Sequence, residues 1–164
     1  MPKGTQSYSY DCGTKVLHLV MAYYGEEYPY YELLHRAKEH KRYGLPEASL
    51  IQMAKARSFK IVAHDNFTIA EIKEHLNKER PVIVLVQGWG KVDTDWKTTN
   101  EYTHYSIVVG VEHGKVFFND PLSFKKAWLT ESEFLERWHA DDKINYAIVI
   151  YKQRGLVNAL EHMW

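Results

Sequence analysis

The chain has 164 residues, of which 45% are hydrophobic and 26% charged, and we expect one globular domain over residues 1–164. Its 21 lysines and arginines balance its 21 aspartates and glutamates. Nucleic acids and anionic membranes attract basic surfaces, so this balance argues against both as partners. The single cysteine excludes an intramolecular disulfide.

The first part of the chain is predicted to be helical. Apolar residues recur at helical spacing over residues 12–24, and Gly25 follows where a helix end favours left-handed backbone. A short second helix is expected over residues 30–38. A third is expected over residues 46–57, with Pro46 at a permitted position in its first turn.

Strands predominate after this point, which favours an α+β fold with a mainly antiparallel sheet. Two capping-box patterns, Thr68 with Glu71 and Thr130 with Glu133, predict helix starts. The helices they begin are expected to end near residues 78 and 138. Apolar and β-branched runs predict strands over residues 60–64, 81–87, 104–112, 115–119, 125–129 and 146–152.

The longest irregular segment is residues 88–103, which contains Trp89, Trp96 and Tyr102. Irregular connections of this length inside a domain are often functional. Two interpretations stay open: a lid that contacts substrate, or a floppy extension of a hairpin.

Cys12 is the first candidate functional residue, because it precedes an apolar helix. Unpaired N–H groups and the helix dipole at such a position stabilise a thiolate and lower the pKa of the thiol. Gly13 leaves the approach to the sulfur open, and the amide of Gln6 could donate a hydrogen bond to an oxyanion nearby. Without further signals, Cys12 would be a small buried residue and Gln6 a solvated one.

His104 opens an apolar strand, and Asp120 closes the next strand just before Pro121. The two side chains share a face of the sheet only if the hairpin between them contains an odd number of extra residues. We therefore predict a three-residue loop or a bulge at Gly114. A plain two-residue turn would place His104 and Asp120 on opposite faces.

The nine histidines raise the question of a metal site. No His-Glu-x-x-His motif is present, and the spacing of His35 and His40 fits one helical face poorly. We assign no metal and no cofactor. The many aromatic residues lack interleaved basic residues, so we expect them to fill the core and line a peptide cleft.

Four segments together resemble a known family: QSYSYDCGTKVLHLVMAYYG, PVIVLV, HYSIVVGVE and VFFNDP. They are similar to the bacteriocin-processing (double-glycine leader) cysteine peptidases and their stand-alone relatives in the papain-like superfamily. The resemblance runs from Gln6 to about Trp138. It implies a papain-like fold with N-terminal helices packed on the sheet, and a peptide or protein substrate. It makes Cys12 the nucleophile, His104 the general base and acid, Asp120 the orienting carboxylate, and Gln6 the oxyanion donor.

The sequence also departs from that family. Relatives commonly have glycine where this chain has Ser58, and members fused to exporters carry a membrane domain and an ATPase that this sequence does not contain. Leader cleavage coupled to secretion is therefore not carried over. Three hypotheses remain: a cysteine peptidase, an acyltransferase or deamidase with the same triad, and a catalytically idle peptide-binding module.

Location and assembly are less constrained. No stretch approaches the roughly 20 apolar residues of a membrane-spanning helix, and the first residues lack the apolar core of a signal peptide. We expect no membrane insertion and a cytoplasmic protein, or a secreted one if an upstream signal has been removed. The segment after Trp138 either completes the sheet or packs on a second copy, so an oligomer is possible.

Overall fold

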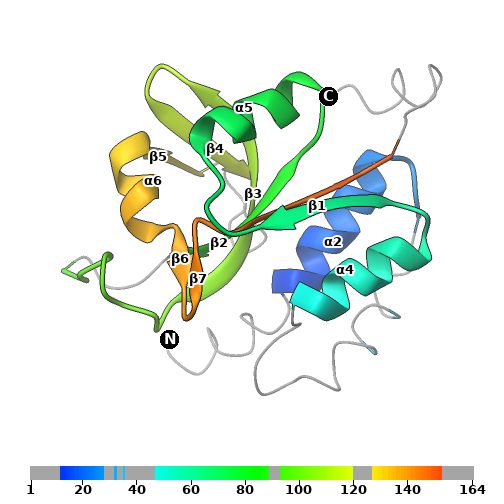
Figure 1. Cartoon of the computed structure of the whole chain (residues 1–164), viewed down its shortest axis with the longest axis horizontal. Helices are drawn as coiled ribbons and strands as arrows, with labels where there is room; N and C mark the ends of the chain where they lie inside the picture. The colour runs from blue at the N-terminus through cyan, green and yellow to red at the C-terminus, as the bar shows by residue number, and fades with distance from the viewer. Residues whose placement is uncertain are drawn as a thin grey trace. The chain divides into compact units, whose positions relative to one another are not determined.

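The computed structural model describes residues 12–27, 32, 35, 47–88, 93–119 and 127–152 (Figure 1). The chain divides into two compact units. The first comprises residues 1–61 and 150–164, and the second residues 62–149.

The first unit contains two described helices that pack on each other, α2 (Cys12–Tyr23) and α4 (Glu47–Ala56). The inward faces of these helices bury apolar side chains completely, among them Leu17 and Met21 of α2 and Leu50 of α4. Gly25 ends α2 with φ of 80°, and the N–H of Glu26 donates to the carbonyl of Met21 over 2.9 Å. The predicted first helix and its glycine stop are confirmed.

The turn after α4 places Ser58 in a backbone conformation that usually carries glycine. Ser58 has φ of 68°, and the N–H of Phe59 donates back to the carbonyl of Ala54 over 3.2 Å. This is the Schellman pattern, in which the left-handed residue is usually glycine. Ser58 therefore adopts a conformation that costs a residue with a Cβ atom about 1–2 kcal/mol.

Ser58→Gly should relieve this cost. Glycine also gains entropy in the unfolded chain, which offsets part of the relief, so we expect a net stabilisation of up to about 1 kcal/mol. Urea unfolding followed by tryptophan fluorescence measures the change. Ser58→Ala, which keeps a Cβ atom at the same φ, is the matched control and should give no such gain.

A six-stranded sheet has the strand order β1-β8-β2-β3-β4-β5, and its strands β2 to β5 lie wholly within the second unit. The four pairings from β8 through β5 are antiparallel, so the predicted α+β class with a mainly antiparallel sheet is confirmed. The helices α5 and α6 pack against strands of this sheet (Figure 1). The elements are β1 (Lys60–His64), α5 (Ile69–Asn77), β2 (Val82–Gln87), β3 (Thr103–Glu112), β4 (Lys115–Asn119), β5 (Ala127–Thr130), α6 (Glu131–Arg137) and β8 (Ala147–Tyr151).

The β3–β4 hairpin corrects one expectation. Its loop is a two-residue turn, with His113 at φ of 52° and Gly114 at φ of 73°, so neither a three-residue loop nor a bulge occurs at Gly114. The extra residue lies earlier, in β3, where the register shifts between Val108 and Gly110. The two-residue turn fits the right-handed strand twist, and the bulge inserts the odd residue at the exposed position between these two partners.

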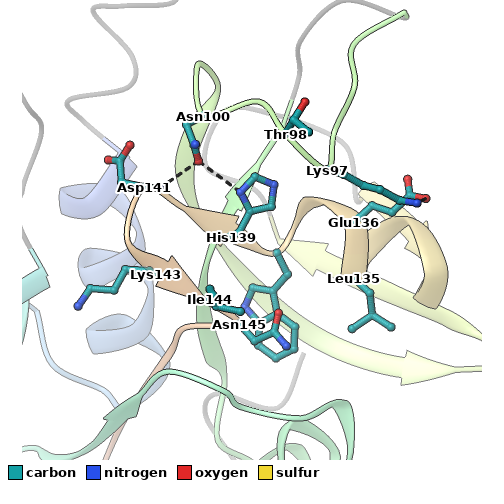
Figure 2. A pocket seen from close by; sticks show the side chains of 11 residues that line it. Lys97, Thr98, Asn100, Leu135, Glu136, His139, Asp141, Lys143, Ile144 and Asn145 are labelled. Carbon is teal, nitrogen blue, oxygen red and sulfur yellow. Dashed lines mark hydrogen bonds and ion pairs between the residues drawn. The ribbon is translucent and has the colours of Figure 1, made fainter.

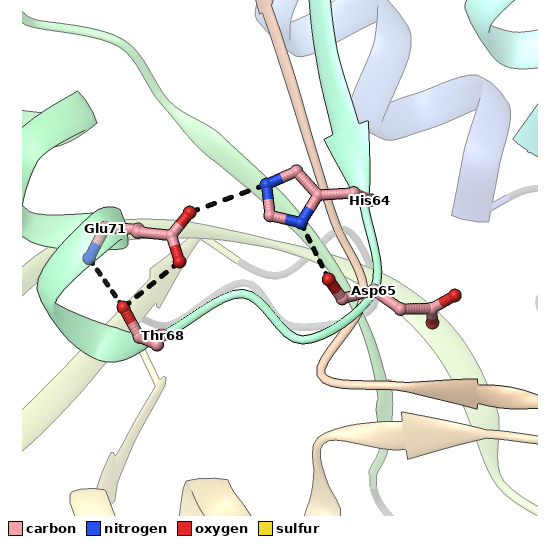
Figure 3. A network of polar contacts seen from close by, with 4 residues as sticks. All are labelled: His64, Asp65, Thr68 and Glu71. Atoms are coloured by element: carbon pink, nitrogen blue, oxygen red, sulfur yellow. Dashed lines mark hydrogen bonds and ion pairs between the residues drawn. The ribbon is translucent and has the colours of Figure 1, made fainter.

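The two predicted capping boxes differ in the structure. At Thr130 the box is complete, because its side chain accepts from the N–H of Glu133 and the Glu133 carboxylate accepts from the N–H of Thr130. At Thr68 the side chain accepts from the N–H of Glu71, but the Glu71 carboxylate lies 3.4 Å from Nε2 of His64 (Figure 3). The other carboxylate oxygen of Glu71 accepts from the Thr68 hydroxyl over 3.3 Å instead of from the backbone N–H, so the reciprocal half of the box is not formed.

A small hairpin was not predicted from the sequence. Strands β6 (His139–Ala140) and β7 (Lys143–Ile144) pair next to α6. Trp138, at the end of that helix, is 1% exposed and donates its indole N–H to the carbonyl of Tyr146 over 3.0 Å. These strands are too short to show an alternating pattern, which is why sequence periodicity missed them.

Some expectations fall outside the described residues. Pro46 is one of them, and of the helix expected over residues 30–38 only Glu32 and His35 are described, both helical and exposed. In the part of the chain that the structure describes, no helix has the length and apolar character needed to cross a membrane.

His75 makes the stability of the fold sensitive to acid. Burial, and then the positive charges of Arg80 and Lys78, lower the pKa of His75 in α5 below its usual 6.5. Near pH 6.5 His75 therefore takes up a proton in the unfolded chain while it stays neutral in the folded chain. The free energy of unfolding should decrease as the pH falls below that value. His75→Gln should flatten this slope in urea unfolding between pH 7.5 and 5.5. His35→Gln, at an exposed helical position, should leave it unchanged.

Candidate active site

The four predicted site residues differ in how far the structure describes them. Cys12 is the first residue of α2, in the first unit, where the backbone fits the predicted helix start. The side chain of Cys12, and all of Gln6 and Asp120, lie outside the described residues. Their roles stay predictions, whereas His104 is described in full.

His104 lies near the start of β3 in the second unit, opposite Val86 of β2. It is 5% exposed, which is unusual for a histidine in a strand of apolar neighbours. The bulge in β3 brings Val108 opposite Phe118, so Phe118 shares a face of the sheet with His104 and Ser106. Asp120 follows just beyond the described end of β4, and its placement is not described.

A small cavity of about 30 Å³ lies against His104. Its wall is apolar along β2, β4 and β5 and becomes polar at the end of β2 and at the end of α6. The lining residues are Val86, Gln87, Gly88, His104, Ser106, Phe118, Ala127, Leu129 and Arg137.

Gln87 ends the apolar strand β2 and is completely buried. Its amide nitrogen donates to Oγ1 of Thr103 over 2.6 Å and to the carbonyl of His139 over 3.0 Å. Its amide oxygen accepts from the N–H of Tyr102 over 3.0 Å. Three elements therefore meet on one side chain, directly before His104. Gln87 was not among the predicted site residues, although a lone amide at the end of an apolar run was a usable signal.

Arg137 adds a positive charge to the same cavity. Its guanidinium lies 3.8 Å from the centre of the Trp96 ring, within the range of a cation–π contact. Burial lowers the pKa of Arg137, and the carboxylates of Glu133 and Glu136 oppose this shift. The group stays protonated at neutral pH, since even a lowered arginine remains a strong base. A negative group bound at the cavity would therefore meet a partly desolvated cation.

The irregular segment before β3 is described from residue 93 to residue 102, and we call this part the strap. His139 holds it: Nε2 of His139 donates to the carbonyl of Trp96 over 2.7 Å, and Nδ1 lies 3.3 Å from Oδ1 of Asn100. The N–H of Asp141 donates to the same Asn100 oxygen over 3.0 Å. Figure 2 shows His139 and Asn100 facing each other at a groove of about 590 Å³. In this part, at least, the segment is fixed to α6 and the β6–β7 hairpin, which argues against a floppy extension.

Among the described residues, no group of three or more histidine, cysteine, aspartate or glutamate side chains is arranged to hold a metal ion. The described polar residues near His104 are an amide, a hydroxyl and a guanidinium, from Gln87, Ser106 and Arg137.

His139→Ala should loosen the strap, because it removes both contacts to Trp96 and Asn100. At about 1 kcal/mol per hydrogen bond, we expect amide hydrogen exchange at Thr98 and Thr99 to accelerate by about 10-fold or more. Leu135→Ala removes an exposed side chain from the same groove and is the control. Equal exchange rates in the two variants would show that His139 does not hold the strap.

A family model described as the peptidase C39 family matches residues 2–153. No match was found among curated proteins.

Two solved structures are similar to the chain. One is the crystal structure of a C39-like peptidase from Bacillus anthracis, with a TM-score of 0.52 and 22% identity over 69% of this chain and 62% of that one. The other is the peptidase domain of Streptococcus mutans ComA, with a TM-score of 0.47 and 18% identity over 87% of this chain and 92% of that one. The chain thus spans less than two thirds of the first structure, and that likeness supports the fold alone.

Proposed function

We propose that this chain, which belongs to the peptidase C39 family, is a cysteine peptidase acting through Cys12 and His104. The observation that carries the proposal is the family match over residues 2–153, a range that contains all four predicted site residues. The proposal treats residues 1–164 as one peptidase domain.

The reaction would run in two stages. The thiolate of Cys12 attacks the carbonyl carbon of a peptide bond, and the backbone N–H of Cys12 with the amide of Gln6 stabilises the oxyanion. The C–N bond then breaks, and the imidazolium of His104 gives its proton to the leaving amine. Water, deprotonated by His104, attacks the thioester carbon and breaks the C–S bond, which releases the acid and restores the Cys12 thiolate and the protonated His104.

The described residues support parts of this mechanism. Cys12 begins a 12-residue helix, and helix N-termini favour thiolates. His104 is buried and in contact with a cavity, and a water-poor setting strengthens electrostatic interactions with a reacting group. In the proposed mechanism Asp120 orients the imidazole of His104, the role that the family resemblance implies. No step calls for a metal or a cofactor.

The substrate class is proposed from the resemblance to double-glycine leader peptidases. We propose that the substrate is a peptide or protein segment containing Gly-Gly. Glycines have no side chain, so they fit narrow clefts and bring the backbone carbonyl close to a nucleophile.

The proposal predicts specific products. Wild-type protein should cleave a peptide containing Gly-Gly after the second glycine faster than the matched Ala-Ala peptide, with the new termini identified by mass spectrometry. Cys12→Ala should abolish cleavage, and His104→Asn should lower it by about 100-fold or more, the scale of general acid–base catalysis. His113→Asn makes the same change at the exposed turn of the same hairpin and should be silent.

The other outcomes separate the remaining hypotheses. Transfer of the acyl group to an added peptide amine, with no free acid formed when that amine is left out, would indicate acyl transfer. Tight binding of a peptide whose mass never changes would indicate a binding module and would contradict the peptidase assignment.

A further inference from the structure

We propose that Gly88 is a positioning residue for His104: its backbone packs against the imidazole and limits where the ring can lie. The inference rests on the proposed function, because it assigns Gly88 a role in the reaction that His104 would perform. Gly88 follows directly after β2 and lines the cavity beside His104.

The contact between the two residues leaves no room for a side chain. A Cβ atom added to Gly88 would lie 2.4 Å from Cε1 of His104, 3.2 Å from Nδ1 and 3.4 Å from Nε2. Ordinary van der Waals contact begins at 3.4 Å, so the ring would have to retreat by 3.4 − 2.4 = 1.0 Å. Because Cε1 is bonded to both ring nitrogens, a steric contact at this atom limits the positions of both nitrogens.

The ring has little space into which it could retreat. His104 is 5% exposed, Val86 lies opposite it across the strand pair, and Phe118 lines the same cavity. The cavity measures about 30 Å³. The free space beside the ring is therefore small.

The backbone of Gly88 cannot easily shift away from the ring either. The N–H of Gly88 donates to the carbonyl of Tyr102 over 3.1 Å, and the buried amide of Gln87 binds the N–H of Tyr102 and the hydroxyl of Thr103. The backbone of Gly88 is thereby tied to the segment that leads into His104. The separation of glycine and imidazole is set by the β2–β3 register.

Catalysis depends on this separation because proton transfer requires close alignment. A misplacement of about 1 Å can cost about 100-fold in rate. Gly88→Ala should therefore lower kcat by about 10- to 100-fold with a smaller change in KM, since the imidazole acts in the chemical steps.

The alkylation of Cys12 by iodoacetamide tests the inference without a known substrate. Cys12 is the only cysteine, so the rate reports on one thiol. In wild type we expect alkylation well below the pKa of a free thiol, about 8.5. His104→Ala should shift the pH profile upward and slow alkylation at pH 6.5 by about 10-fold or more. Gly88→Ala should shift it in the same direction.

Gly110→Ala is the matched control, because a Cβ atom there would meet Phe117 at an ordinary 3.8 Å. It should keep the wild-type profile. In the double variant Gly88→Ala/His104→Ala, the loss should equal that of His104→Ala alone, since Gly88 acts through the imidazole. If Gly88→Ala fails to fold, this double variant should fold, because the group that collides is gone.

A second readout follows the ring itself. With ¹³C-labelled histidine, the Cε1–H resonance of His104 should move in Gly88→Ala and stay in place in Gly110→Ala. A wild-type alkylation profile for Gly88→Ala, while His104→Ala is shifted, would overturn the role of Gly88 and leave the proposed function standing. A wild-type profile for His104→Ala would instead overturn the proposed function.

Discussion

The pairing of β2 with β3 is the constraint on which the described part of the site depends. It sets Val86 opposite His104 and Gln87 opposite Thr103, and the Gln87 side chain then binds the backbone just before the strand. A buried amide with three partners is costly to disrupt, because each orphaned group loses about 1–3 kcal/mol. The position of the imidazole is therefore fixed by a network that also holds the strap and the β6–β7 hairpin.

The strap and α6 depend on each other through a second set of contacts. Arg137 stacks on Trp96, while His139, two residues later, binds the carbonyl of the same tryptophan. One aromatic residue of the strap is thus held from its ring and from its backbone. The long irregular segment behaves here as part of the scaffold, and its Arg137 contact reaches the cavity of His104.

The regular elements could be predicted from the sequence because their signals are local. The apolar run of β2, the glycine after α2 and the Thr130 capping box all describe interactions within a few residues. The sequence predicted that the hairpin needs one extra residue for His104 and Asp120 to share a face. The position of that residue was predicted wrongly, at Gly114 instead of Val109, because the place of a bulge depends on the partner strand.

Tertiary contacts account for what the sequence did not reveal. The Gln87 network joins residues far apart in the chain, and the close approach of Gly88 to His104 depends on register to within an ångström. Glycine at that position looked like the first residue of a loop. The roles of Gln6, Cys12 and Asp120 rest on motif resemblance and on the family match, since their side chains are outside the described residues.

The bulge in β3 also limits how this hairpin can vary in length. Losing Val109 alone would remove the bulge and leave the pairs on either side of it unchanged, so that Phe118 would stay opposite Val108 and on the face of His104. Removing residues in pairs from the turn would shorten the hairpin and preserve its sidedness. Functional variants of this chain should therefore tolerate the loss of Val109 or even changes in the turn, whereas an odd insertion that no bulge absorbs would exchange the two faces of β4.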